Sequence, residues 1–331
     1  KDYLKSNEDF LNDVIVKVTS ADGKTNIDYE NESIPGDAKI HLGYQFNIPE
    51  WLLTTKSLKS GDYYDITLPK DIKLDIHNGS LKDDTGEKIA SFNVLENGKI
   101  RITFNDSVEN LYKIKGELSY DQYLEEDIVV GENVISIPME DGSKEIIFNV
   151  KPTGGHKIEK RVINPNDQQT LTWEVSINTK REALKNAKVT DKMPEGLKTD
   201  SIKIYEQTVN KSGAVVSTGK ELVGGTDFII VGDVISFIGE YAETNKSFKI
   251  VYETSVDEDK VPEAGGPLEY KNTATLTDDG VDTNSNEAKT TIQFGKMLEK
   301  DKGKPITVEG EEGYFYEWTI KYKYRNKELP K

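Results

Sequence analysis

The side chains that most often carry enzyme chemistry are scarce in this sequence of 331 residues. It contains no cysteine, which excludes disulfides, thiolate metal sites and cysteine nucleophiles. The three histidines, His41, His77 and His156, are scattered along the chain without a shared motif, and such histidines are usually surface or capping residues. We therefore expect no metal site, no cofactor and no enzyme that turns over a substrate.

Two acidic clusters could in principle bind a cation or act on a sugar. The segment 278–286 is rich in side-chain oxygens, but its spacing differs from that of the Asp-x-Asp-x-Asp-Gly calcium loop. The pair Glu125-Glu126 could act on a glycosidic bond only within a cleft, and carboxylate pairs outside one usually lie on the surface. We interpret the first cluster as a solvated hairpin and the second as a pair of surface side chains.

The overall charge narrows the range of partners. The formal net charge is −16 and the isoelectric point is near 4.8, whereas nucleic acid binding requires clustered Lys and Arg. An anionic membrane surface is disfavoured for the same reason, and no apolar run approaches the length of a membrane span. The chain begins at Lys1 without a signal peptide or a wall-anchoring tail, so we interpret it as a monomeric fragment of a larger protein.

Alternation of apolar and polar residues recurs along the chain and predicts an all-β fold. Pairs such as Asp22-Gly23, Asn78-Gly79 and Asp279-Gly280 separate the apolar runs and suit the positive φ of tight hairpin turns. Many short strands joined by such turns are typical of tandem immunoglobulin-like antiparallel β-sandwiches. The clearest predicted strands are 99–104, 145–150, 170–177, 247–252 and 288–294.

A linker and an internal repeat divide the chain into domains. The stretch 151–155, Lys-Pro-Thr-Gly-Gly, should end a sheet, because proline lacks an N–H donor and paired glycines are flexible. The sequence around Trp173 reappears around Trp318, at a separation of a domain length. We predict an N-terminal immunoglobulin-like domain at 1–152, a second such domain at 153–294, and the first strands of a third, incomplete domain at 295–331.

Four segments of the middle domain carry a family resemblance: Lys160, 171–178 (Leu-Thr-Trp-Glu-Val-Ser-Ile-Asn), 187–196 (Ala-Lys-Val-Thr-Asp-Lys-Met-Pro-Glu-Gly) and 269–275 (Glu-Tyr-Lys-Asn-Thr-Ala-Thr). They resemble the collagen-binding-type domain of the collagen-adhesin family. The members of this family are cell-wall-anchored surface proteins of Gram-positive bacteria that recognise matrix molecules. In the first domain, segments 60–69, 102–106 and 108–111 are similar to the N-terminal partner domain of the same adhesins.

This resemblance implies a self-formed isopeptide bond that stabilises the domain mechanically. Lys160 would be the nucleophile, Asn272 the acceptor amide and Asp191 the assisting acid. Burial among apolar groups lowers the pKa of a lysine and raises that of a carboxylic acid, so the amine can attack while the acid shuttles a proton as ammonia leaves. The alternative is that all three are ordinary polar residues at strand ends.

The same resemblance extends to neighbouring positions. Trp173 is expected to form part of the apolar wall around the reacting groups. In the third domain Lys300 is the matching lysine, with Lys302 or Lys304 as alternatives, and its acid and amide partners would lie beyond Lys331.

The resemblance finally implies an extracellular, cell-wall-anchored adhesin whose anchor signal lies outside this fragment. A host extracellular-matrix protein, with collagen as the leading candidate, would bind in the cleft between the first and second domains. Candidate contacts are Glu174 and Ser176, together with Tyr63 and Tyr64, because tyrosine offers a large contact area at little cost in side-chain entropy. The alternative function is a structural stalk or pilus-like module without a ligand site.

Overall fold

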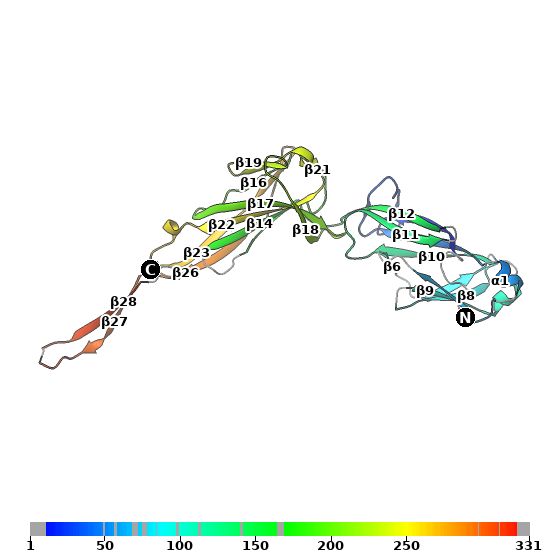
Figure 1. The fold of residues 1–331 in the computed structure, drawn as a ribbon, viewed down its shortest axis with the longest axis horizontal. Helices are drawn as coiled ribbons and strands as arrows, with labels where there is room; N and C mark the ends of the chain where they lie inside the picture. Colours follow the sequence, from blue (N-terminus) through cyan, green and yellow to red (C-terminus); the bar gives the residue numbers. More distant parts are fainter. Residues whose placement is uncertain are drawn as a thin grey trace. The chain divides into compact units, whose positions relative to one another are not determined.

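The computed structural model describes residues 11–48, 50–55, 58–67, 72–74, 78–83, 85–96, 99–111, 114–139, 142–163, 169–296, 298–310 and 312–322. The chain forms two compact units (Figure 1): the first comprises Lys1–Gly155 with Thr208–Val216, and the second His156–Gln207 with Ser217–Lys331. Among the described residues, no helix is both long and apolar enough to cross a membrane.

The first unit contains three sheets within the described residues. Their strand orders are β2-β1-β4-β10-β6, β5-β9-β8-β7 and β11-β12-β3. The described strand pairings are antiparallel except for the short parallel contact of β12 with β3. A short helix, α1 (Glu50–Thr54), follows β4. The strands are β1 (Leu11–Thr19), β2 (Asn26–Ile27), β3 (Ile34–Pro35), β4 (Lys39–Ile48), β5 (Tyr63–Thr67), β6 (Ile72–Leu74), β7 (Asn78–Lys82), β8 (Lys88–Val94), β9 (Lys99–Phe104), β10 (Ile114–Leu124), β11 (Gly131–Met139) and β12 (Gly142–Lys151).

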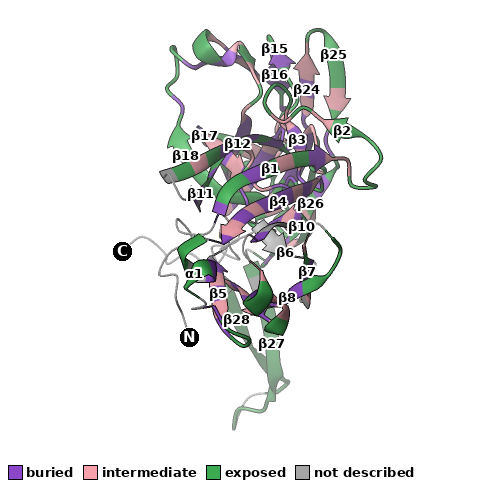
Figure 2. Cartoon of the chain, turned by 90° about the vertical axis from the view of Figure 1, so that its right-hand side faces the viewer, coloured by how far each residue is buried: buried purple, intermediate pink, exposed green. Residues whose placement is uncertain are grey.

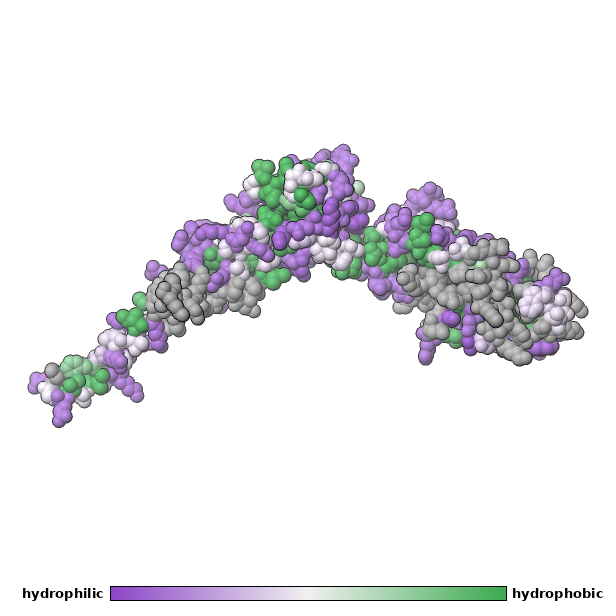
Figure 3. Space-filling model, in the orientation of Figure 1, coloured by the Kyte–Doolittle hydropathy of each residue, from purple (hydrophilic) through white to green (hydrophobic). Residues whose placement is uncertain are grey.

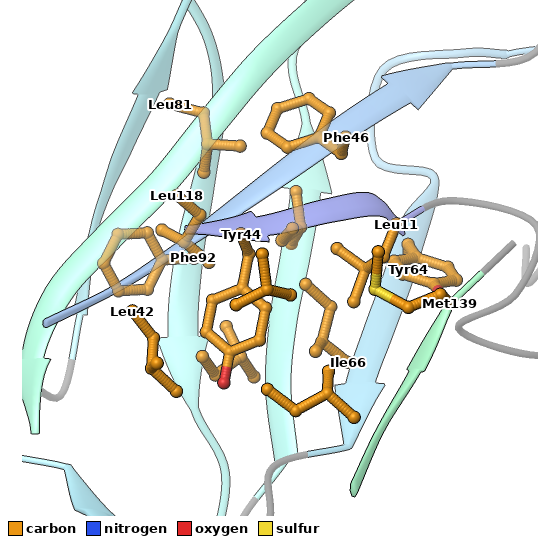
Figure 4. Close-up of a cluster of buried hydrophobic side chains, with 14 of the residues drawn as sticks. Leu11, Leu42, Tyr44, Phe46, Tyr64, Ile66, Leu81, Phe92, Leu118 and Met139 are labelled. Carbon is orange, nitrogen blue, oxygen red and sulfur yellow. The ribbon is translucent and has the colours of Figure 1, made fainter. Parts of the chain in front are cut away.

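The core of the first unit is built from alternate residues of its strands. On β4, Leu42, Tyr44 and Phe46 point into one cluster of apolar side chains (Figure 4) and are almost completely buried. Phe92 from β8 and Leu118 from β10 lie in the same cluster. Successive side chains of a strand point to opposite faces, so the alternation in the sequence becomes one buried face per sheet.

The predicted turn at Asn78-Gly79 is wrong. Both residues belong to strand β7, where Asn78 pairs with Asn93 and Gly79 with Phe92 on β8. A Cβ atom on Gly79 would lie 2.3 Å from Cε1 of Phe92, so glycine is required here by the close approach of an aromatic ring. By contrast, the predicted turn at Asp279-Gly280 is confirmed: both residues have positive φ, 47° and 83°, between β24 and β25.

The second unit contains two five-stranded sheets, with the orders β13-β14-β22-β17-β18 and β19-β20-β16-β24-β25, and the strand pairs β15-β21, β23-β26 and β27-β28. The end of β17 and the start of β18, within Thr208–Val216, belong to the first unit. Every strand pairing described in this unit is antiparallel. The strands are β13 (Ile158–Ile163), β14 (Thr170–Ile177), β15 (Leu184–Lys185), β16 (Lys188–Thr190), β17 (Leu197–Val209), β18 (Val215–Glu221), β19 (Phe228–Val231), β20 (Val234–Phe237), β21 (Glu243–Thr244), β22 (Ser247–Val256), β23 (Gly266–Asn272), β24 (Thr275–Asp278), β25 (Val281–Asn284), β26 (Ala288–Phe294), β27 (Leu298–Ile306) and β28 (Phe315–Tyr322).

The core of the second unit lies between its sheets. Trp173 and Val175 on β14 and Phe248 and Ile250 on β22 are completely buried, and they pack with apolar residues of β16, β20, β23, β24 and β26. Buried residues alternate with exposed and intermediate ones along the strands (Figure 2). Sheets that each bury one face against another form a sandwich, so the predicted all-β class with antiparallel β-sandwiches is confirmed.

The last described segment of the second unit is a hairpin of β27 and β28, which pair only with each other in the described part of the chain. Its large apolar side chains, among them Leu298, Trp318 and Ile320, are exposed. Apolar side chains are exposed on β19 as well, where they form part of the apolar surface visible in Figure 3. Within the described part of the chain, the hairpin lacks the apolar cover that β13 and β14 receive. A two-stranded hairpin alone is only marginally stable in water.

Candidate functional site

The structure brings Lys160, Asp191 and Asn272 together inside the second unit. Lys160 lies in the middle of β13, Asp191 directly follows β16, and Asn272 is the last residue of β23. Nζ of Lys160 contacts Oδ2 of Asp191, and Nδ2 of Asn272 donates a hydrogen bond of 2.8 Å to Oδ1 of the same carboxyl group. Their exposed fractions are only 1%, 3% and 7%. Three polar residues from distant parts of the sequence thus share one buried site.

Aromatic rings and a methionine line this site. Nζ of Lys160 lies 5.3 Å from the ring centre of Trp173 and 5.4 Å from that of Tyr252. The Sδ atom of Met193 lies 3.5 Å from Nδ2 of Asn272. The family resemblance implies Trp173 in this wall but does not indicate Tyr252. Tyr252 ends the predicted strand 247–252, and the apolar alternation of that strand could have indicated an inward side chain.

The electrostatics of the site follow from its burial. Burial lowers the pKa of Lys160, and the contact with Asp191 opposes this shift without reversing it. Burial also raises the pKa of Asp191 above its ordinary value, against the opposing effect of Lys160. Both shifts favour the uncharged forms, an amine and a carboxylic acid. An uncharged lysine has a free electron pair, which is what a nucleophile requires.

The predicted ligand contacts on β14 are occupied by other protein groups. Glu174 is 8% exposed, and its carboxylate is paired with both Arg161 and Lys249. Ser176 is half-buried, and its hydroxyl donates a 2.9 Å hydrogen bond to Oε1 of Gln207. In this conformation both side chains contribute to the stability of the sheet surface.

The predicted ligand contacts on β5 differ from each other. Tyr63 is half-buried, and the guanidinium of Arg101 lies 3.9 Å from the centre of its ring. Arg101 is held there by two hydrogen bonds to Asp65, of 2.7 and 2.8 Å. Tyr64 is only 1% exposed and belongs to the core of the first unit (Figure 4), because neighbouring residues of a strand face opposite ways. This burial removes Tyr64 from the candidate ligand surface.

Replacement of Glu174 by glutamine is expected to make the stability of the second unit less dependent on pH. Burial raises the pKa of Glu174, but the bonds from Lys249 and Arg161 outweigh this effect and hold the pKa below its ordinary value of 4.5. The ion pairs therefore stabilise the folded unit above that pH, and this contribution is lost as the pH falls through the lowered pKa.

Chemical denaturation of Glu174→Gln at several pH values measures this effect. At neutral pH the free energy of unfolding should fall by about 1–3 kcal/mol, and the difference from the unsubstituted chain should shrink well below pH 4.5. Glu269→Gln is the matched control, because Glu269 pairs with Lys271 at the surface and should change stability little. A pH-independent difference in Glu174→Gln would contradict the proposed ionic contribution.

The hairpin β27–β28 repeats the strand register of β13–β14. In the second unit Trp173 faces Val162, and Lys160, two positions earlier, faces Val175. In the hairpin Trp318 faces Lys302, so Lys300 stands where Lys160 stands. Nζ of Lys300 lies 4.2 Å from the ring centre of Trp318. The register thus favours Lys300 over the alternatives Lys302 and Lys304 as the counterpart of Lys160.

Two known domain families match parts of the chain. Residues 156–287 match the family model of the collagen binding domain. The matched range contains all three residues of the buried site and most of the second unit. Residues 37–134, in the first unit, match the family model of a bacterial immunoglobulin domain.

Curated relatives include fibronectin-binding protein A from the Staphylococcus aureus strains NCTC 8325 / PS 47 and USA300, each 28% identical over 132 residues. The alignment covers 37% of this chain and 12% of the relative, so the chain matches a small part of those proteins. Similar solved structures include the collagen adhesin CNA from S. aureus, with 15% identity, a TM-score of 0.31 and coverage of 98% of each chain. The serine-rich repeat protein Srr2 from Streptococcus agalactiae has 17% identity, a TM-score of 0.36 and coverage of 86% of this chain and 94% of its own.

Proposed function

We propose that this chain is part of a bacterial surface adhesin that binds a host extracellular-matrix protein. The collagen binding domain at residues 156–287 and the relatives named fibronectin-binding protein A support this proposal. Collagen is the leading candidate ligand. The proposed location is the outside of the cell, where a chain without disulfides is stabilised by its hydrophobic cores or by another covalent device.

That device is a self-formed isopeptide bond between Lys160 and Asn272. The observation that carries this part of the proposal is the buried Asp191 carboxyl group, which has one oxygen on each reacting nitrogen. An acid in this position can serve as both base and acid within a single reaction. Folding supplies the remaining requirement, because it holds the amine and the amide together at high effective concentration.

The reaction balances without any added reagent. The uncharged Nζ of Lys160 attacks Cγ of Asn272, and the bond from Cγ to Nδ2 breaks. One proton passes from Nζ to Oδ2 of Asp191, and the carboxyl group returns one proton through Oδ1 to Nδ2, which leaves as ammonia. Asp191 ends in the protonation state in which it began. The site reacts a single time, because the reaction consumes the lysine amine and the asparagine amide.

Binding to immobilised collagen, fibrinogen and fibronectin, measured by surface plasmon resonance against an albumin surface, tests the adhesin proposal. Saturable binding to collagen is the expected result, and saturable binding to another of these proteins would replace collagen as the ligand. Tyr63→Ala and Ser176→Ala then test two candidate contacts, and an unchanged affinity in both variants would remove them from the ligand site. Absence of binding to all three proteins would favour the structural stalk or pilus-like module.

A further inference from the structure

The nucleophile of the proposed bond lies on an edge strand. Among the described strands, β13 pairs only with β14, and Lys160 faces Val175 in that pairing. In an antiparallel pair, residues alternately direct both backbone groups toward the partner strand or away from it. The backbone groups of Lys160 bond elsewhere, as described next, so they face away from β14. An edge strand whose outer groups lack partners is held by a single ladder.

The side chain of Asn286 supplies the missing partner. The N–H of Lys160 donates to Oδ1 of Asn286 at 2.9 Å, and Nδ2 of Asn286 donates to the carbonyl of Lys160 at 2.8 Å. One side-chain amide thus forms the reciprocal pair of bonds that a residue of a neighbouring strand would form. Asn286 is exposed and belongs to no strand, since it lies between β25 and β26.

Ser285, the residue before Asn286, forms hydrogen bonds with the backbone just after the strand that carries the acceptor Asn272. The N–H of Ser285 donates to the carbonyl of Ala274 at 2.8 Å, and the N–H of Ala274 donates to Oγ of Ser285 at 3.0 Å. The Ser285 hydroxyl donates in turn to the carbonyl of Asn286 at 2.7 Å. Ala274 follows Asn272 by two positions, and Asn272 pairs with Ala288 where β23 and β26 run side by side (Figure 1). Ser285 and Asn286, which are adjacent in the sequence, therefore form hydrogen bonds with the backbone on the two sides of the proposed bond: Asn286 with Lys160, and Ser285 with the segment just after Asn272.

We propose that Asn286 is a positioning residue for the Lys160–Asn272 bond, an inference that rests on the proposed function. It fixes the edge strand β13 relative to Asn272, so that the long and flexible lysine side chain delivers Nζ to Cγ. A shift of β13 by one residue would turn Lys160 to the opposite face of the sheet. Reactions of this kind require the two atoms to be held within about 3–3.5 Å. Asn286 acts through the Lys160 backbone and touches none of the reacting atoms.

The rate of bond formation in newly synthesised full chain tests this role. The chain is made in a short cell-free synthesis, stopped in acid at intervals, and the fraction that has lost one ammonia is read from the intact mass. Asn286→Ala should slow bond formation about tenfold. Asn284→Ala is the matched control, because Asn284 lies two residues away and bonds only the Thr275 hydroxyl, at 2.8 Å, among its described side-chain contacts. This control should react at the unsubstituted rate.

The dependence of the rate on pH separates positioning from a loss of folded protein. Asn286→Ala should lower the plateau rate and leave its midpoint pH unchanged, because Asn286 contacts neither Nζ nor the carboxyl group. The folded fraction is measured in the Asn272→Ala background, which cannot form the bond. If Asn286→Ala folds poorly, Asn286→Asp keeps the size and one acceptor, and its rate per folded molecule should also be reduced.

Three outcomes are decisive. An unsubstituted rate in folded Asn286→Ala or Asn286→Asp would overturn the positioning role and leave the bond itself established. An equal slowing in Asn284→Ala would overturn it as well, because the effect would then belong to the whole hairpin end. A chain that loses no ammonia without any substitution would overturn the proposed bond and this role with it.

Discussion

Replacement of Lys160 by methionine should abolish the loss of ammonia and lower the free energy of unfolding of the second unit by about 4–5 kcal/mol. The bond would close a loop of roughly 110 residues, and a cross-link of that size restricts the unfolded chain strongly. Methionine keeps most of the lysine volume, so little of the loss should come from a cavity in the core. Intact mass and guanidinium unfolding measure the two effects.

Two control variants isolate the contribution of the covalent bond to the free energy of unfolding. Lys157→Met removes a lysine near the same strand that pairs with Glu182 at 3.3 Å on the surface, and it should change stability little. Lys160→Met in the Asn272→Ala background should cost far less than in the unsubstituted chain, because no bond is left to lose. Persistence of the ammonia loss in Lys160→Met would exclude Lys160 as the nucleophile.

Asp191→Asn should suppress bond formation although Lys160 and Asn272 both remain in place. An amide cannot accept a proton from Nζ and return one to the leaving nitrogen, and general acid–base catalysis commonly contributes about 10²–10⁴-fold. Timed synthesis followed by intact mass analysis should therefore show a rate at least about a hundredfold lower. The change keeps the shape of the side chain, so the core should remain packed.

Asp233→Asn is the matched control for this variant. Asp233 accepts the backbone N–H of Asp191 through its own carbonyl, at 3.0 Å, and its carboxylate only adds a repulsive charge that raises the pKa of Asp191. Removal of that charge should leave bond formation nearly unchanged. Bond formation at the unsubstituted rate in Asp191→Asn would rule out the proton shuttle.

The family resemblance around Lys160, Asp191 and Asn272 is what predicts from the sequence that these three residues come together. The same resemblance implies that Trp173 forms part of the wall around them. The all-β class, in contrast, follows from the alternation of apolar and polar residues, which depends only on the period of the strand.

Local sequence patterns do not predict features that depend on tertiary contacts. The pair Asn78-Gly79 has the local preference of a turn, but the ring of Phe92 across the sheet requires glycine within a strand. Tyr63 and Tyr64 have equal local preferences, and the packing of β5 decides which of them is buried. Asn286 stands in a polar stretch that resembles any solvated turn, because its contacts depend on the register of a strand far away in the sequence.

The proposed bond would give the second unit an unusual chain topology. Lys160 lies on the first strand of the unit and Asn272 on the partner of β26, so the bond would turn residues 160–272 into a closed ring. Tension along the chain would pass across the ring junction, and the contour length stored in the ring, roughly 380 Å at about 3.4 Å per residue, would not be released. A single protease cut within the ring would also leave the two ends covalently joined. The unit would then have to be cut twice before it could release a fragment.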